Sequence, residues 1–251
     1  MKIVIAPEYR YLRQQIENIP NRNYQIFKTF CNRRNTVEGV YFGNQRFVIK
    51  KYKRPTLANC LVYTWFRKTK PKRAYEYAQR LLEKGIKTPK PVAYIEIKKH
   101  LFFHTGYFIS EYLPFPTLKE AYCNTTESRM KEKMEKAFVD FLICLHTDKQ
   151  IIQTDSVSSN YLVNENNGNH EFILVDVNRI RFGKTPSIRQ AMKSFNQLCN
   201  DYHELAKVVP HYMEARKADV EKGFSYILLT KYSSRIRSRL KAIIRKIFLN
   251  K

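Results

Sequence analysis

The sequence predicts an α+β protein with two lobes, a first half rich in strands and a second half that is mainly helical. Up to about residue 113, runs of β-branched and aromatic residues alternate with turn residues, and Pro114 and Pro116 then interrupt the chain. Beyond these prolines, apolar residues recur at the spacing of a helix. A chain of 251 residues is long enough to bury a core in each lobe.

The first clear element is a pair of strands within residues 37–52, VEGVYFGNQRFVIKKY. Val, Tyr, Phe and Ile favour strands, and the Gly43-Asn44 dipeptide suits a tight hairpin turn. The pattern therefore predicts that Lys50 lies in the second strand of this hairpin.

A helix followed by two extended segments is expected next. In residues 73–84, RAYEYAQRLLEK, the apolar positions fall on one helical stripe, and Gly85 ends the helix. Residues 88–97, TPKPVAYIEI, are extended, and residues 101–113, LFFHTGYFISEYL, form a strand. The predicted stripe consists of Ala74, Tyr77, Ala78, Leu81 and Leu82.

The second half begins with a helix over residues 127–146, whose apolar side chains repeat at helical spacing. Two short strands follow, YLV at 161–163 and FILVDV at 172–177, and the polar loop between them contains a glycine. Residues 186–251 are mainly helical in pattern.

The second hairpin brings chemically useful side chains together. Asn160 and Asp176 are equally far from Gly168, so antiparallel pairing centred there places them near each other, and Asp155 lies in the preceding loop. Mg²⁺ prefers carboxylate and amide oxygens together with substrate phosphates. An unpaired carboxylate within the apolar run FILVDV would be costly to desolvate, so a metal or cation is expected beside Asp176.

This set of residues indicates phosphoryl transfer. A hydroxyl that attacks a phosphoryl group needs a carboxylate to orient it and accept its proton, while metal ions and a lysine neutralise the phosphates. Asp155 would act as the base, Lys50 would contact the phosphates, and Asn160 and Asp176 would hold the metal.

Three short motifs resemble those of protein kinases. FVIK, which ends at Lys50, is similar to the V-A-I-K strand, QTDSVSSN at 153–160 to the catalytic loop H-x-D-x-x-x-x-N, and VDV around Asp176 stands in place of D-F-G. The segments RAYEYAQRLLEKGIKTPKPVAYIE and LVDVNRIRF resemble the Kdo/WaaP family of lipopolysaccharide core kinases. The resemblance covers roughly residues 30 to 185.

The resemblance implies a bilobal protein-kinase-like fold, with an N-lobe at about 1–110, a hinge at about 111–114 and a C-lobe at about 115–251. ATP would bind between the lobes with Mg²⁺, and the acceptor would be a sugar, Kdo or heptose, of the lipopolysaccharide inner core. The implied roles are catalytic base for Asp155, metal ligands for Asn160 and Asp176, phosphate contact for Lys50 paired with Glu76, adenine-binding hinge for Glu111 to Leu113, and contacts to anionic substrate groups for Arg179 and Arg181.

Two departures from the kinase pattern keep other functions open. No G-x-G-x-x-G precedes Lys50, where CNRRNT at 31–36 stands instead, and Gln153-Thr154 replaces the usual His-x pair. A catalytically weak pseudokinase or basic binding module would fit these losses. A serine/threonine protein kinase would use the same residues, but no A-P-E follows Asp176. An aminoglycoside or choline kinase would need an acidic acceptor pocket, which the net charge disfavours.

The charge indicates anionic partners. Lys and Arg number 46 against 22 Asp and Glu, which gives +24 at pH 7. Nucleic acid is disfavoured because no zinc spacing, RNP-like motif or glycine-rich basic segment accompanies this charge. The start of the sequence lacks the apolar run of a signal peptide, and no 18 apolar residues run together. The five cysteines are odd in number and widely separated, so a cytoplasmic protein with reduced thiols is expected.

The last segment predicts a basic amphipathic helix at about 234–249. Its composition is typical of a helix at an anionic membrane surface, here the cytoplasmic face of the inner membrane, where a lipid-linked glycan would lie. A helix packed on the C-lobe would show the same apolar stripe. The stripe consists of Ile236, Leu240, Ile243, Ile244, Ile247 and Phe248, and the basic residues are Arg235, Arg237, Arg239, Lys241, Arg245, Lys246 and Lys251.

Overall fold

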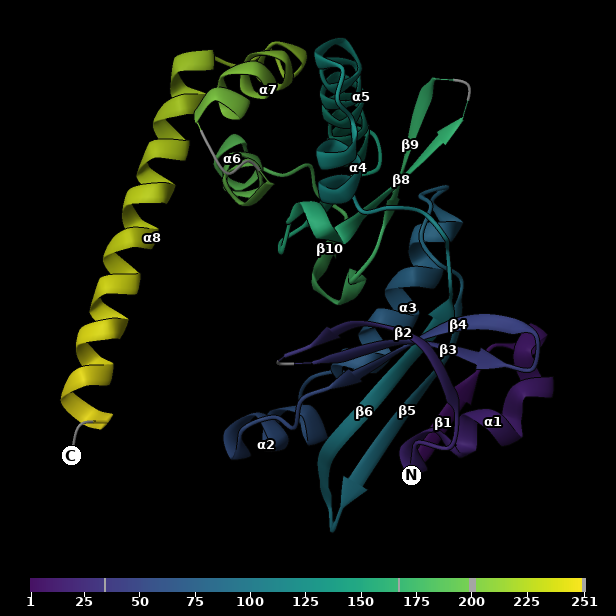
Figure 1. The fold of residues 1–251 in the computed structure, drawn as a ribbon. Coiled ribbons are helices and arrows are strands. Elements are labelled where there is room, and N and C mark those ends of the chain that lie inside the picture. The colour runs from purple at the N-terminus through teal and green to yellow at the C-terminus, as the bar shows by residue number, and fades with distance from the viewer. Residues whose placement is uncertain (34, 167, 199–201, 250–251) are drawn as a thin grey trace. The chain divides into compact units, whose positions relative to one another are not determined.

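The computed structural model describes residues 1–33, 35–166, 168–198 and 202–249. The chain divides into two compact units, each with its own core. The first unit contains Met1–Phe115 and the short segment Ile173–Asn178, and the second contains Pro116–Phe172 and Arg179–Lys251. The first unit is built on a sheet and the second mainly on helices (Figure 1).

The first unit is organised around a six-stranded antiparallel sheet in the order β1-β5-β6-β4-β3-β2. The expected hairpin is confirmed as β3 and β4, and its turn places Gly43 at φ 60°, which a residue without Cβ adopts freely. The strands are β1 (Lys2–Ile5), β2 (Gln25–Asn32), β3 (Thr36–Phe42), β4 (Gln45–Tyr52), β5 (Pro91–Lys99) and β6 (Phe102–Glu111).

Helix α3 (Lys70–Glu83) packs against β5 and β6 and confirms the expected helix of this unit. It begins earlier than the apolar stripe indicated, because the side chain of Thr69 caps it and Pro71 suits its first turn. The buried stripe is also rotated from the expected one, with Tyr75 buried and Leu82 exposed. The other helices are η1 (Pro7–Leu12), α1 (Arg13–Glu17), η2 (Ile19–Asn21) and α2 (Leu57–Trp65).

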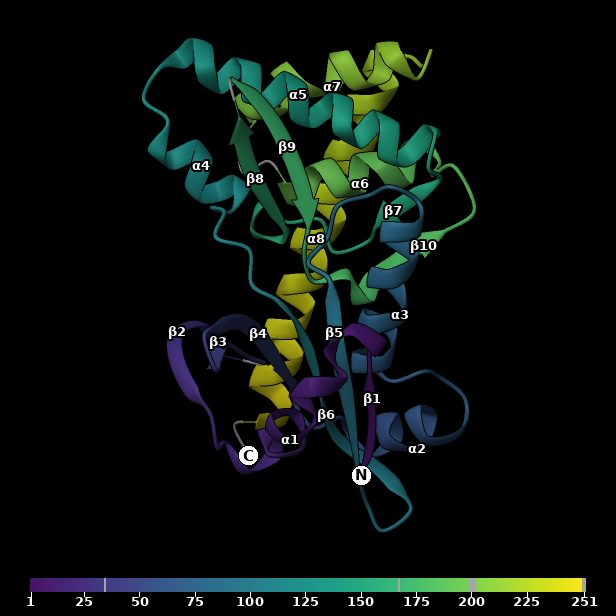
Figure 2. The same cartoon turned by 90° about the vertical axis from the view of Figure 1, so that its right-hand side faces the viewer.

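The second unit contains helices α4 to α8 and two short two-stranded ribbons (Figure 2). Aromatic side chains contact one another within its core. Phe138 of the long helix meets Tyr161 and Phe172 edge to face at ring distances of 4.9 and 5.0 Å. The helices are α4 (Leu118–Asn124), α5 (Ser128–Thr147), α6 (Ile188–Leu198), α7 (Tyr202–Ala215) and α8 (Val220–Leu249). The ribbons pair β7 (Ile151–Gln153) with β10 (Ile180–Phe182) and β8 (Tyr161–Asn166) with β9 (Asn169–Leu174).

The strand expected over 172–177 is shorter than its apolar run. Strand β9 ends at Leu174, whose backbone N–H and C=O bond to Lys87 and to the hydroxyl of Thr88. Asp176 then has φ 55°, in the left-handed region that aspartate tolerates better than most residues. The interpretation that Asp176 lies inside a buried strand is therefore wrong, because the chain turns before reaching it.

Helix α8 is longer than the segment expected at its end. It starts at Val220, and its first turns pack on α6 and α7, with Ile227 buried. Ile236, Leu240 and Ile243 of the predicted apolar stripe are exposed. The described helices include none that is both long and apolar enough to cross a bilayer. The side chains of Ile244, Ile247, Phe248, Lys241, Arg245, Lys246 and Lys251 lie outside the described part of the chain.

Candidate active site

Lys50 lies on β4, a strand with neighbours on both sides. It pairs with Val37 of β3 and with Phe108 of β6, so its backbone position is fixed from two directions. Its side chain is only 13% exposed, and its Nζ lies 2.6 Å from Oδ1 of Asp176. The expectation that Lys50 lies in the second strand of the hairpin is confirmed.

The carboxylate of Asp176 faces two donors within the first unit. Besides Lys50, the Nδ2 of Asn178 donates to Asp176 Oδ1. The hydrogen bonds of Leu174 to Lys87 and Thr88 tie this segment to the sheet-bearing unit. Charge-assisted contacts of this kind offset part of the cost of removing the carboxylate from water.

Glu76 pairs with other lysines than the one expected. Its Oε2 lies 2.8 Å from Lys68 Nζ, and its Oε1 lies 3.9 Å from Lys72 Nζ, one helical turn earlier on α3. The expected pair of Lys50 with Glu76 is therefore not the one in this structure. The physical reason is that Glu76 has two nearer cations, and Lys50 has Asp176.

Tyr52 and Arg73 are two buried polar residues near this pair that the sequence did not single out. The Nζ of Lys50 lies 5.5 Å from the ring centroid of Tyr52, two residues further along the same strand face. Burial, and then the charge of Asp176, raise the pKa of Tyr52, while Arg73 acts in the opposite direction. Within the described part of the chain, the Tyr52 hydroxyl and the Arg73 Nε have no hydrogen-bond partner. Strand alternation from Lys50 would have identified Tyr52.

Of the expected hinge residues, Glu111 is the last residue of β6 and Leu113 follows the strand. The Glu111 N–H donates to the Lys90 carbonyl at 3.0 Å, and its Oε1 accepts from the Tyr9 hydroxyl at 2.6 Å. Burial, reinforced by this carboxylate, raises the pKa of Tyr9. The Glu111 side chain therefore serves the packing of the N-terminal segment on the sheet, and Leu113 is half-buried.

A second polar group, in the other unit, contains Asp155 and Asn160. The Nδ2 of Asn160 donates to the backbone carbonyl of Asp155 at 2.8 Å, which closes the loop between them. The Nη1 of Arg179 lies 2.9 Å from Asp155 Oδ2, and the Arg179 carbonyl accepts from both the N–H and the hydroxyl of Thr154. Pairing of β7 with β10 holds this arrangement in register.

Oxygen atoms dominate the donor set offered by these residues. The amide nitrogen of Asn160 donates to the Asp155 carbonyl, which leaves Oδ1 of this buried side chain as the atom that could accept a metal ion. Carboxylate and amide oxygens are the ligands that Mg²⁺ prefers. Arg179 contacts Asp155, whereas Arg181, on β10, has an exposed side chain.

The strand-rich unit with its Lys50–Asp176 pair, and the helical unit with the Asp155 loop, define a protein-kinase-like fold. The solved structure titled "WaaP in complex with acyl carrier protein" shares this fold, with a TM-score of 0.61 at 11% sequence identity, covering 94% of this chain and 98% of that one. No curated protein sequence matches the chain.

The family model of the lipopolysaccharide kinase (Kdo/WaaP) family matches residues 23–222. The chain belongs to this family, and it is therefore a kinase. The resemblance seen in the sequence motifs is confirmed, and the match extends beyond the residues that carried it.

Proposed function

We propose that this lipopolysaccharide kinase transfers the γ-phosphoryl group of ATP, with Mg²⁺, to a hydroxyl of an inner-core sugar, Kdo or heptose. Family membership gives the kinase class, the glycan substrate and the use of ATP. The observation that supports the use of Mg²⁺ and the assignment of the site is the Lys50–Asp176 ion pair. It brings the lysine proposed to contact the phosphates beside the carboxylate proposed to hold the metal.

Lys50 is suited to neutralise the phosphates of the nucleotide. Its ammonium is fixed on a central strand and largely shielded from solvent, so its charge acts on an anion more strongly than a surface lysine would. In this proposal the backbone from Glu111 to Leu113 receives the adenine.

Asp176 and Asn160 would hold the metal. Bound Mg²⁺ supplies positive charge that offsets the charge of the transferring phosphoryl group. Asp176 presents a carboxylate that already attracts a cation, and Asn160 presents an amide oxygen in a fixed orientation. On metal binding, the Asp176 carboxylate would contact Mg²⁺ and its contact with Lys50 would weaken.

Asp155 would orient the acceptor hydroxyl and accept its proton. Arg179 holds Oδ2 of this carboxylate, and the Asn160 side chain holds its backbone, so the group is positioned before the substrate arrives. Arg181 is placed on the strand beside Arg179 and would meet anionic groups of the core glycan together with it.

The acceptor is a lipid-linked glycan in this proposal, which places the enzyme at the cytoplasmic face of the inner membrane. The second half of α8 would contact the anionic surface, since Ile236, Leu240 and Ile243 are exposed among basic residues. Near such a surface each basic side chain contributes about 1 kcal/mol.

The test is incubation of the purified chain with Mg-ATP and lipid A precursors that carry either Kdo or heptose, followed by mass spectrometry of the glycolipid. The expected product gains the mass of one phosphoryl group, and fragmentation identifies the sugar that carries it. Consumption of ATP without modification of either acceptor would contradict the assignment of the substrate.

A further inference from the structure

An exposed aromatic edge lies on the first unit, formed by the end of α2 and the tip of the β5–β6 hairpin. Phe66 is 85% exposed, Leu101 is 76% exposed and Trp65 is 61% exposed, values unusual for large apolar side chains. The aromatic edge consists of Leu61, Val62, Trp65, Phe66, Leu101 and Phe102.

The aromatic edge is a preformed surface. The rings of Trp65 and Phe102 meet edge to face at 5.6 Å, which connects the helix to the hairpin. The hydroxyl of Thr64 accepts a hydrogen bond from the Phe103 N–H at 3.1 Å and donates to the Cys60 carbonyl at 2.7 Å. These contacts fix the end of α2 against the β5–β6 hairpin, from which the exposed side chains project.

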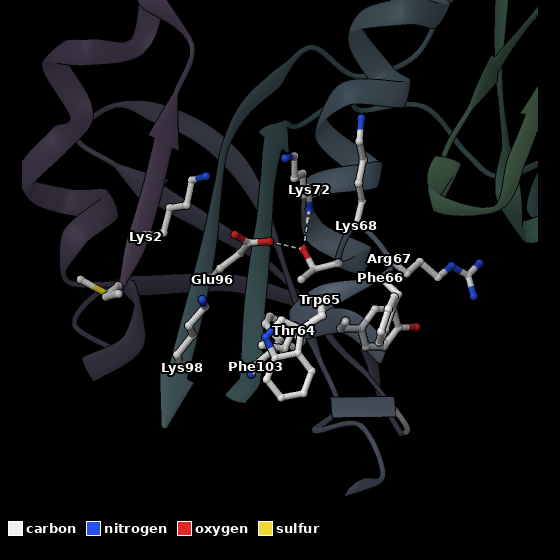
Figure 3. Close-up of a pocket in the computed structure, with 13 residues that line it drawn as sticks. Lys2, Thr64, Trp65, Phe66, Arg67, Lys68, Lys72, Glu96, Lys98 and Phe103 are labelled. Carbon is white, nitrogen blue, oxygen red and sulfur yellow. Dashed lines mark hydrogen bonds between the residues drawn. The ribbon is translucent and has the colours of Figure 1, made fainter. Parts of the chain in front are cut away.

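Basic residues surround a hollow of about 560 Å³ beside this edge (Figure 3). Its lining carries five Lys or Arg side chains and the carboxylate of Glu96, which accepts a hydrogen bond from Thr69. Two of the five, Lys68 and Lys72, pair with Glu76, and the lining still carries an excess of positive charge. Trp65 and Phe66 line the same hollow, so apolar and cationic groups share one surface. The five cations are Lys2, Arg67, Lys68, Lys72 and Lys98.

We propose that this surface binds the headgroup region of an anionic lipid bilayer. Aromatic and aliphatic side chains that project from a helix end and a hairpin tip enter a yielding bilayer easily, whereas a protein partner would need matching pockets for each of them. Lysine and arginine side chains at the same level contact the lipid phosphates through their charged ends. The surface includes neither Lys50 nor Asp176, and its binding requires no phosphotransfer.

Trp65 makes a direct test available, because the chain contains a single tryptophan. Vesicles of phosphatidylglycerol and phosphatidylcholine should shift the tryptophan emission of the full-length protein to shorter wavelength, and brominated acyl chains should quench it. Vesicles of phosphatidylcholine alone should produce a much smaller change. Binding through α8 alone would leave Trp65 in water, so co-sedimentation with unshifted emission that iodide still quenches would overturn the proposal.

Variants that keep the reporter locate the contact. The double substitution Phe66→Ser with Leu101→Ser should weaken vesicle binding several-fold. The control Tyr11→Ser should not, although the side chain of Tyr11 has the same exposed fraction as that of Trp65, 61%. Binding unchanged by the double substitution contradicts the proposal, and circular dichroism verifies that each variant is folded.

Charge reversal tests the basic part of the surface. Arg67→Glu and Lys98→Glu should each reduce affinity for anionic vesicles by about fivefold or more, the factor that corresponds to one basic side chain near the surface. Lys184→Glu, an exposed lysine of the second unit, is the matched control. If polyglutamate shifts the Trp65 emission and the vesicles do not, the surface recognises acidic polypeptides and the membrane proposal is wrong.

Discussion

The ammonium of Lys50 lies 2.6 Å from the carboxylate of Asp176, and this contact ties a central strand to the turn that follows β9. Both residues belong to the first unit, although the intervening segment Pro116–Phe172 belongs to the second. The pair is therefore a long-range link as well as the centre of the proposed phosphate site.

Replacement of Lys50 should affect both stability and nucleotide binding. Lys50→Met leaves the Asp176 carboxylate without its cation, at a cost of roughly 1–3 kcal/mol in the free energy of unfolding, and it weakens ATP binding. Lys51→Met, at the next position on the strand, where the side chain is exposed, should change neither quantity appreciably. Urea denaturation and ATP titration measure the two effects, and equal behaviour of both variants would argue against a role for Lys50.

Removal of the proposed metal ligands should be distinguishable by the Mg²⁺ dependence. Asp176→Ala should weaken Mg-ATP binding and abolish transfer, whereas Asn160→Ala should lose activity that added Mg²⁺ partly restores. The wild-type melting temperature should rise more with ATP and Mg²⁺ than with ATP and a chelator, because ligand binding to the native state stabilises it. Equal stabilisation under both conditions would count against the metal assignment.

The buried histidine of the second unit should make stability depend on pH. Nη1 of Arg216 donates to the Tyr212 oxygen, and the same hydroxyl is hydrogen-bonded to Nδ1 of His146 at 2.8 Å. Burial, and then the charge of Arg216, lower the pKa of His146 from 6.5 to about 3.

The unfolded chain binds this proton more readily than the native one does. The resulting stability is complete above pH 6.5 and is lost as the pH falls from 6.5 toward about 3. The free energy of unfolding should fall in that window by at most about 1.4 kcal/mol per pH unit. Denaturation at several pH values should show a shallower slope for His146→Leu than for wild type. Identical slopes for wild type and His146→Leu would refute this account.

The second half of α8 should be separable from the fold. The first turns of the helix pack on α6 and α7, whereas the described side chains beyond Ser233 are exposed. A chain that ends after Tyr232 should therefore retain its thermal stability and ATP binding but lose much of its co-sedimentation with anionic vesicles. A truncated protein that unfolds would mean that the segment packs on its own unit instead.

The sequence predicted those features that local pattern determines. The Gly43-Asn44 turn predicted that Lys50 lies on a strand, and helical spacing predicted α3 and α5. The expected hairpin around Gly168 corresponds to β8 and β9. Strand β1 is only four residues long and is stabilised by pairing with β5, so no local pattern identified it. Its existence depends on a neighbour that lies far along the chain.

The parts of the site that could not be predicted depend on tertiary contacts. The partner of Lys50 was expected to be Glu76, but the hydrogen bonds of Leu174 bring Asp176 to the sheet, and α3 offers Glu76 its own lysine. The apolar residues of FILVDV did not predict the turn at Asp176. Pairing of Arg179 with Asp155 follows from the β7–β10 register. Each of these strands has only three residues, which is too short a pattern to predict from the sequence.

The most direct test of the central claim is the rate of phosphoryl transfer to a lipopolysaccharide core acceptor by wild type and by Asp155→Asn. Asp148→Asn, an exposed aspartate at the end of α5, serves as the control. Wild type and the control should add one phosphoryl group at the same rate, while Asp155→Asn binds ATP normally and reacts about 10²–10⁴-fold more slowly. Transfer by Asp155→Asn at the wild-type rate would contradict the account.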